Sequence, residues 1–184
     1  MPLNPVIVET SRLQSMTLSG TFPKCKISKG QRKVKIALRT TCSQDSVFAR
    51  DLYFETMRGM IERLFGWDQE REERNFAAFF KVDEVRIITA DDRDVGWIQE
   101  QVENRMINLG SFYVMPAMQG RGIGTKVLNI LLARAADQSK AMTLAVLKIN
   151  PARYFYEKRG FRITREDRHK FYMRADPGGP RMDN

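Results

Sequence analysis

The chain has 184 residues, 42% of them hydrophobic and 29% charged, and a formal net charge of +9 at pH 7. This length and composition fit one globular domain with a buried core and argue against wholesale disorder. No stretch approaches the ~20 apolar residues of a membrane span, and the first residues lack the layout of a signal peptide. Two cysteines and a single histidine, His169, supply neither a disulfide framework nor a zinc site. We therefore expect a reduced, cytoplasmic protein without a metal.

Charge is segregated along the chain. Residues 1–43 carry a net charge of +7, residues 44–103 carry −7, and residues 104–184 carry +9. Such segregation suggests one cationic and one anionic partner rather than a uniform nucleic-acid-binding face. The alternative is that both regions are ordinary solvated surfaces.

Hydrophobic periodicity and turn residues predict the order of the structural elements. Residues 1–32 show no sustained pattern and are expected to form a loosely ordered N-terminal extension. The predicted elements are a strand at 34–38, a helix that begins at Asp45 or Ser46 and ends at Gly66, a helix at 68–80, strands at 85–89, 95–102 and 106–114, a helix at 122–138, a strand at 142–147, a short helix at 151–158, and strands at 161–164 and 170–174. Short polar turns between the three strands that follow the second helix indicate an antiparallel meander. One domain is expected over residues 33–175, with a C-terminal tail at 176–184.

A glycine-rich loop joins the strand at 106–114 to the helix that follows it. Gly120, Gly122 and Gly124 alternate with other residues. A strand, a glycine loop and a helix N-terminus together direct several backbone N–H groups at one place, which suits a phosphate or pyrophosphate. The loop lacks the lysine of a Walker motif, and its third glycine comes one residue too early for a dinucleotide-binding fingerprint. Taken alone, it indicates either an anion site or a turn.

Two motifs resemble those of the GNAT superfamily of N-acetyltransferases. The pattern Gln119-x-x-Gly122-x-Gly124 at the start of a helix is similar to the acetyl-CoA loop of that family. Further along the chain, Asn150 follows a strand, and Tyr156-Glu157-Lys158-Arg159-Gly160-Phe161 matches the family pattern Tyr-Glu-x-x-Gly-Phe. The spacing from Asn150 to Tyr156 is one residue shorter than in many members. The resemblance covers roughly residues 33–175.

The resemblance implies an α/β (α+β) fold of the GNAT type. We expect a central mixed, mostly antiparallel twisted sheet of six to seven strands, flanked by about four helices. A splayed pair of strands should lie at the coenzyme A site.

Acetyl-CoA is the cosubstrate that the resemblance implies. N–H groups of residues 119–125 would receive the pyrophosphate without a metal, and Arg121, Lys126 and Arg153 would approach the 3′-phosphate. Backbone groups of Phe112 and Val114 would pair with pantetheine, and an N–H near Val114 would polarise the thioester carbonyl. The predicted cofactor-binding residues are Phe112, Tyr113, Val114, Gln119, Gly120, Arg121, Gly122, Ile123, Gly124, Thr125, Asn150 and Arg153.

The resemblance implies that Tyr156 is the general acid, and a phenol, which is protonated at neutral pH, can assist a departing thiolate. Without the resemblance it would be interpreted as a packed aromatic residue. The general base is not apparent, because the strands at 106–114 and 142–147 contain no carboxylate. Glu100 and Glu103 on the meander are tentative base candidates, and Glu55, Asp68 or a water chain are alternatives.

The resulting hypothesis is an N-acetyltransferase that moves acetyl from acetyl-CoA to a primary amine by direct attack. Because the acidic segment 44–103 is expected to form the acceptor side, we expect a cationic or amine-bearing acceptor, such as a polyamine, an aminoglycoside-like amine, a peptide N-terminus or a lysine. Two other functions remain open: a non-catalytic acyl-CoA sensor on the same fold, and a nucleic-acid-binding module that uses the basic N-terminal arm. The chain lacks the interleaved aromatic and basic residues of single-strand platforms, which argues against nucleic acid. Homodimerisation is also left open.

Overall fold

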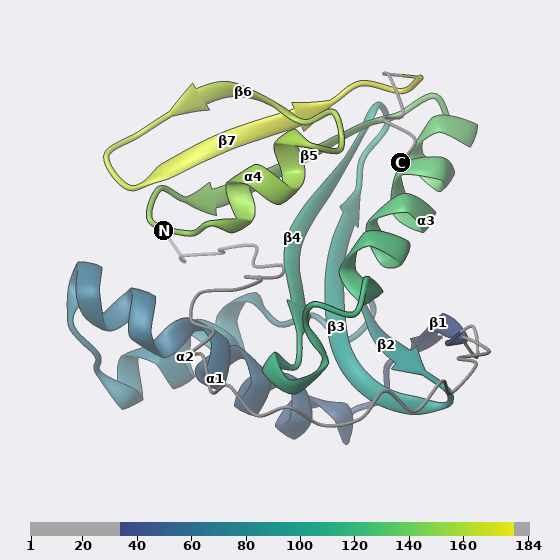
Figure 1. Ribbon diagram of the computed structural model, residues 1–184. Coiled ribbons are helices and arrows are strands. Elements are labelled where there is room, and N and C mark those ends of the chain that lie inside the picture. The colour runs from purple at the N-terminus through teal and green to yellow at the C-terminus, as the bar shows by residue number, and fades with distance from the viewer. Residues whose placement is uncertain (1–33, 179–184) are drawn as a thin grey trace, which may run out of the picture.

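The computed structural model describes residues 34–178, which form a seven-stranded sheet with four α-helices (Figure 1). The elements in chain order are β1 (Ile36–Thr40), α1 (Asp45–Phe65), α2 (Gln69–Phe79), β2 (Val85–Ala90), β3 (Arg93–Val102), β4 (Met106–Val114), a 3-10 turn η1 (Pro116–Met118), α3 (Ile123–Asp137), β5 (Ala141–Leu147), α4 (Ala152–Glu157), β6 (Arg162–Glu166) and β7 (Lys170–Ala175). The strand order is β1-β2-β3-β4-β5-β7-β6. Only the β4–β5 pair is parallel. The predicted mixed, mostly antiparallel sheet is therefore confirmed.

The helix starts and stops follow from capping chemistry. Asp68 accepts a hydrogen bond from the Arg71 N–H (2.9 Å) and begins α2 as predicted. Gly66, with φ +72°, ends α1. Asp45 differs from the expectation of a cap, because it is the first residue of α1 and its carboxylate is engaged elsewhere. The predicted extension at 1–32 and the tail residues 179–184 lie outside the described residues.

The helices cover opposite faces of the sheet and enclose two hydrophobic clusters. α1 and α2 pack on one face against residues that include Ile87, Trp97 and Tyr113. α3 and α4 pack on the other face against residues that include Phe112 and Val114. The Trp97 Nε1–H donates to the Ala49 carbonyl (3.1 Å), which fixes α1 on β3. Neighbouring residues of β4 thus serve both clusters, as strand alternation requires.

β4 and β5 are neighbours over only part of their length. Met106–Leu109 pair with Ala141–Leu144, and beyond that point β4 continues beside β3 while β5 continues beside β7. The register of β4 against β3 also shifts here, so that Gly110 has no partner residue opposite it. This divergence, visible in Figure 1, is the predicted splayed strand pair.

The close approach of β3 and β4 at the open end depends on Gly96. A Cβ atom on Gly96 would lie 2.2 Å from the Tyr113 carbonyl oxygen, which no side chain can tolerate without a backbone shift. We expect Gly96→Ala to lower the free energy of unfolding by about 1–3 kcal/mol, measured by urea denaturation. Gly59→Ala is the matched control, because a Cβ there meets nothing within 4 Å and alanine favours the α1 helix. Equal effects of the two substitutions would contradict the steric argument.

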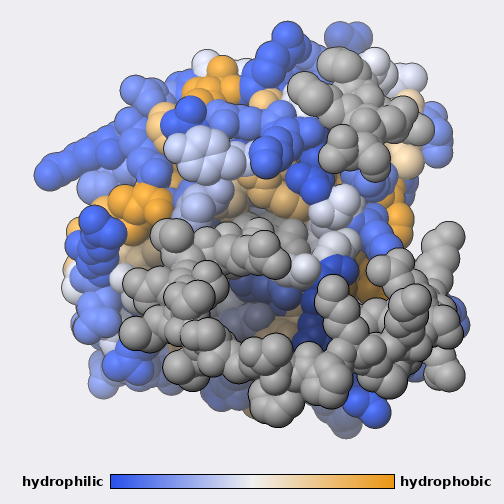
Figure 2. All heavy atoms as spheres, in the orientation of Figure 1, coloured by the Kyte–Doolittle hydropathy of each residue, from blue (hydrophilic) through white to orange (hydrophobic). Residues whose placement is uncertain are grey.

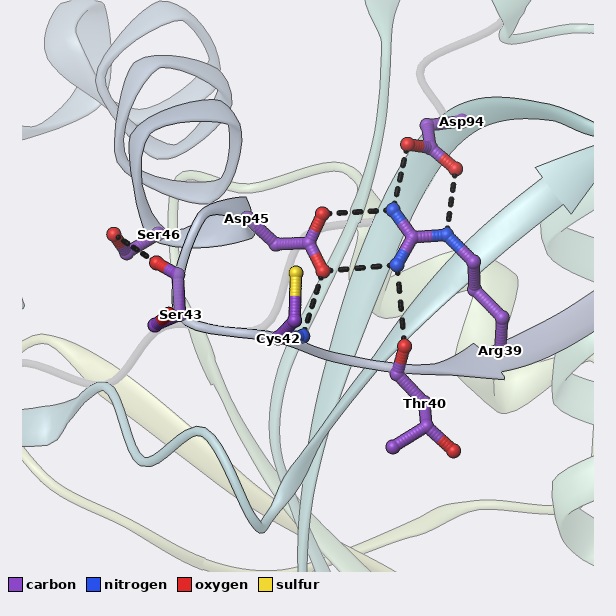
Figure 3. A network of polar contacts seen from close by, with 7 residues as sticks. All are labelled: Arg39, Thr40, Cys42, Ser43, Asp45, Ser46 and Asp94. Atoms are coloured by element: carbon purple, nitrogen blue, oxygen red, sulfur yellow. Dashed lines mark hydrogen bonds and ion pairs between the residues drawn. The ribbon is translucent and has the colours of Figure 1, made fainter.

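A charged network holds the edge strand β1 to the rest of the domain (Figure 3). The Arg39 guanidinium donates to both carboxylate oxygens of Asp45 (2.7 and 2.8 Å) and to both of Asp94 (2.7 and 3.0 Å). Asp45 also accepts from the Cys42 N–H (2.8 Å). The hydrogen bonds from Arg39 hold the pKa of Asp45 well below its usual range. The network therefore joins β1, the first turn of α1 and the start of β3.

Because the folded-state pKa of Asp45 is lowered, its stabilising effect is complete above its unfolded pKa of ~3.9 and is lost as pH falls toward the folded value. We expect Asp45→Asn to cost about 1–3 kcal/mol at pH 7, the range for hydrogen bonds to charged groups. The difference from the wild type should narrow below about pH 4. Denaturant titrations at pH 7 and pH 3 measure this, with Asp51→Asn on the exposed Arg50 pair as control. A difference that is independent of pH would refute the assignment.

Candidate active site

The free edge of β4 faces the opening between β4 and β5. The Met115 N–H donates to the Val95 carbonyl on β3 (2.8 Å). Since backbone groups of successive strand residues point to opposite edges, the N–H groups of Phe112 and Val114 point away from β3, toward the opening. No residue of β5 pairs with β4 beyond Leu109 within the described chain. Such an edge is a template for an extended ligand.

The glycine loop folds back onto this edge. The Gln119 side-chain amide donates to the Val114 carbonyl (2.8 Å), so the loop is anchored to the open end of β4. Gly120 (φ +72°) and Gly122 (φ +75°) take left-handed backbone conformations that side chains disfavour. Sequence reasoning placed Gln119 in the loop but missed this anchoring contact.

The helix after the loop presents backbone donors. Its first helical hydrogen bond runs from the Lys126 N–H to the Gly122 carbonyl (3.1 Å), so the N–H groups of Ile123, Gly124 and Thr125 lie ahead of it. The buried Ile123 side chain fixes this turn in the core. α3 has 15 residues, and its N-terminus carries the positive end of the helix dipole. Arg121 and Lys126 are exposed beside it. The arrangement suits an anion.

Arg159 joins this helix start to α4. Its guanidinium hydrogen-bonds the Thr125 hydroxyl, donates to the Phe155 carbonyl (2.9 Å) and lies 3.9 Å above the Phe155 ring. A cation beside the positive end of a helix dipole is unfavourable by itself, and a bound anion would offset this effect. No sequence pattern singled out Arg159, which occupies a variable position of the second motif.

Two of the predicted cofactor-binding residues make contacts within the α4 region. The buried Asn150 accepts a hydrogen bond on Oδ1 from the Ala152 N–H (2.9 Å), which starts α4. Arg153 pairs with Glu157 (2.7 Å) and lies 4.8 Å from the centre of the Phe171 ring. Both side chains therefore have structural roles in holding α4 against the sheet.

Tyr156 lies on α4 with its side chain fully buried in the same hydrophobic cluster as Phe112 and Val114. Its hydroxyl has no hydrogen-bond partner among the described residues. Burial raises the pKa of Tyr156 well above 10, so the phenol stays protonated at neutral pH. The pKa of Tyr113 is raised too, by burial and by its neighbour Tyr53. A buried hydroxyl without a partner is costly, so the Tyr156 hydroxyl calls for an explanation.

The predicted base candidates lie at the other end of β4. Glu100 pairs in register with Leu109, where β4 still contacts β5, and its nearly buried carboxylate forms an ion pair with Arg134 of α3. Glu103 is exposed in the turn before β4. The structure thus does not bring either carboxylate together with Tyr156 and the open edge.

A cavity of about 590 Å³ adjoins the point where β4 and β5 diverge. It is lined by the end of α1, the middle of β4 and β5, and the β6–β7 hairpin: Phe65, Asn108, Leu109, Gly110, Thr143, Leu144, Ala145, Thr164, Asp167, Arg168, His169, Lys170, Tyr172 and Met173. Only Phe65 comes from the acidic segment 44–103. A second cavity, of about 670 Å³, is lined mainly by residues of that segment, including Asp83, Glu84, Glu100 and Glu103. The expectation that the acidic segment forms the acceptor side therefore stays a prediction.

Residues 34–178 lack two further features. No helix in this range is long and apolar enough to cross a membrane. Within the same range, histidine, cysteine and acidic side chains nowhere gather in threes as metal ligands would.

Comparison with known proteins places this geometry in a family. Residues 81–163 match the model of the acetyltransferase (GNAT) domain, which includes the glycine loop and the segment from Asn150 to Phe161. A search of curated proteins finds no match.

Solved structures share the fold. A PaiA N-acetyltransferase from Thermoplasma acidophilum, in complex with coenzyme A, has a TM-score of 0.63 at 19% identity, covering 77% of this chain and 99% of its own. Arabidopsis thaliana Naa50, in complex with the bisubstrate analogue CoA-Ac-MVNAL, has a TM-score of 0.56 at 19% identity, covering 77% and 98%. The ribosomal-protein-S18-alanine N-acetyltransferase from Escherichia coli has a TM-score of 0.57 at 18% identity, covering 82% and 99%. The family match over residues 81–163 and the shared fold support the GNAT superfamily of acetyltransferases for this chain.

Proposed function

We propose that this protein is an N-acetyltransferase that transfers acetyl from acetyl-CoA to a primary amine. The observation that carries the proposal is the open backbone edge of β4, to which the glycine loop is anchored and whose side chains share a hydrophobic cluster with Tyr156. The Thermoplasma protein was solved with coenzyme A and the Arabidopsis protein with a coenzyme A bisubstrate analogue, which supports the same cosubstrate here.

The residues present fit acetyl-CoA without a metal. The N–H groups from Gly120 to Thr125 would hold the pyrophosphate at the start of α3, where the glycine backbone is open to a ligand. Arg159, Arg121 and Lys126 would supply positive charge for the phosphates. The N–H groups of Phe112 and Val114 would pair with the amides of pantetheine. In this proposal Asn150 and Arg153 act mainly by positioning α4, since their side chains already contact α4 and the neighbouring sheet.

Groups on β4 and on α4 have different roles in the proposed reaction. The neutral amine attacks the acetyl carbonyl carbon to form the C–N bond, and a β4 backbone N–H, from Phe112 or Val114, stabilises the negative charge that develops on oxygen. The C–S bond breaks and its electron pair leaves with sulfur, which accepts a proton from Tyr156. The nitrogen loses one proton, which returns to the phenolate through water. A water chain is the base that we propose, since Glu100 and Glu103 lie at the closed end of β4.

A thiol-release assay with acetyl-CoA and a panel of primary amines tests this function. We expect thiol release that depends on the amine, with an acetylated product identified by mass spectrometry. Tight binding of acetyl-CoA with no release for any amine would instead indicate a non-catalytic acyl-CoA sensor.

Tyr156→Phe removes the proposed acid and leaves the ring in place. We expect kcat to fall about 10²-fold, the lower end for loss of a general acid, while the KM for acetyl-CoA changes little. Tyr154→Phe is the control, because this neighbouring side chain is 61% exposed. An unchanged rate across pH would remove Tyr156 from the mechanism.

Tyr156→Phe should lower activity but raise stability. Removal of a buried hydroxyl without a partner should raise the free energy of unfolding by about 1 kcal/mol. Tyr53→Phe should lower it by a similar amount, because the Tyr53 hydroxyl donates to the buried Glu72 carboxylate (3.1 Å). Thermal and urea denaturation of both variants measure the contrast. A loss of stability in Tyr156→Phe would show that its hydroxyl is structural.

A further inference from the structure

We propose that the acceptor amine carries an anionic group, a carboxylate or a phosphate, and that the Lys170 ammonium binds this group. The inference rests on the proposed function and specifies its substrate class. It concerns the cavity of about 590 Å³ where β4 and β5 diverge.

The register of β7 places Lys170 on the cavity side of the sheet. Phe171 and Met173 pack into the cluster beneath α3 and α4, so Lys170 and Tyr172 point to the opposite face. Lys170 pairs with Leu147 of β5, whose side chain belongs to the cluster on the α1 face. α1 and α2 cover β2 to β4 on this face, and the cavity lies beside them over β5 and β7.

The only carboxylate that lines the cavity among the described residues belongs to Asp167, and the hairpin turn uses it. One oxygen accepts from the N–H groups of His169 (2.8 Å) and Lys170 (2.7 Å), and the other accepts from the Tyr172 hydroxyl (2.8 Å). These hydrogen bonds lower the pKa of Asp167 to about 2. The carboxylate is thus engaged within the turn and is poorly placed to receive an ammonium ligand.

The cavity has positively charged side chains in its lining. Arg168 and Lys170 both line it. Figure 2 shows hydrophilic side chains interspersed with hydrophobic ones over β6 and β7. Within residues 34–178, no carboxylate oxygen lies within 4 Å of the Lys170 ammonium, which is partly buried. Burial lowers the pKa of Lys170, and the nearby Asp167 carboxylate, which forms no ion pair with it, offsets this effect only in part. An anionic group on the acceptor would supply further compensation.

Lys148, which directly follows β5, is a lysine beside this hairpin whose charge is compensated. The Lys148 ammonium forms an ion pair with Glu166 (3.2 Å) and lies 5.1 Å from the centre of the Phe171 ring. Lys148 does not line the cavity. It is therefore the matched control for substitution of Lys170.

The test compares four short amines in the thiol-release assay: β-alanine, phosphoethanolamine, ethanolamine and 1,3-diaminopropane. We expect kcat/KM to be about 10- to 100-fold higher for at least one anionic amine than for ethanolamine, and lowest for the diamine. The first two compounds distinguish carboxylate from phosphate. A preference for ethanolamine or the diamine would overturn the inference and leave the proposed function intact. If neither these amines nor a wider panel of amines gives thiol release, the proposed function itself is contradicted.

Substitutions assign the preference to Lys170. Lys170→Met should raise the KM for the anionic amine about tenfold or more while the KM values for acetyl-CoA and ethanolamine stay unchanged, which also shows that the variant folds. Lys170→Arg should retain the preference and Lys170→Glu should reverse it toward the diamine. Lys148→Met should behave like the wild type. An anionic preference that survives in Lys170→Met would refute the role of this residue.

Discussion

The architecture of the candidate site depends on the point at which β4 and β5 stop pairing. After Leu109 the edge of β4 carries N–H and C=O groups that no strand of the described chain satisfies, although Phe112 and Val114 are buried as side chains. Buried backbone groups require hydrogen-bond partners, so this edge favours an extended ligand that contains amides. The Gly110 bulge and the close packing at Gly96 maintain the divergence. The free edge of β4 thus leaves one strand position next to it that a bound ligand can occupy.

The two halves of the site lie far apart in the chain and are joined by a few contacts. Gln119 attaches the loop to β4, and Arg159 attaches α4 to the first turn of α3. Tyr156 shares a hydrophobic cluster with Phe112 and Ile123, so its ring cannot move independently of the edge or the helix start. Anion binding at the loop and the position of the phenol are therefore mechanically connected.

Sequence reasoning recovered the elements whose signals are local. The Met106–Val114 strand was predicted to the residue, and the Asp68 cap followed from side-chain chemistry. Asp45 or Ser46 was expected to cap α1. The sequence does not show that Arg39, on a separate strand, hydrogen-bonds the Asp45 carboxylate. The sequence also does not show that Glu100 lies opposite Leu109, where pairing of β4 with β5 ends, or that its carboxylate pairs with Arg134; its role as a base stays a prediction. Local pattern predicts elements, and long-range pairing decides which residues meet.

The contrast between local pattern and spatial arrangement also applies to the acceptor that was expected from net charge. The acidic segment 44–103 pointed to a cationic acceptor, yet that segment contributes only Phe65 to the cavity. Most of its carboxylates lie on exposed surfaces of α1 and α2 or in ion pairs such as those of Arg39, where solvent and partners screen them. The β6–β7 turn is short, but it lines the cavity directly, and its own aspartate is used within the turn. Because electrostatic interactions fall off with distance and solvation, a few partly buried groups at the cavity outweigh a larger number of distant surface charges. The acceptor that we propose is therefore based on the hairpin rather than on the average charge of the segment 44–103.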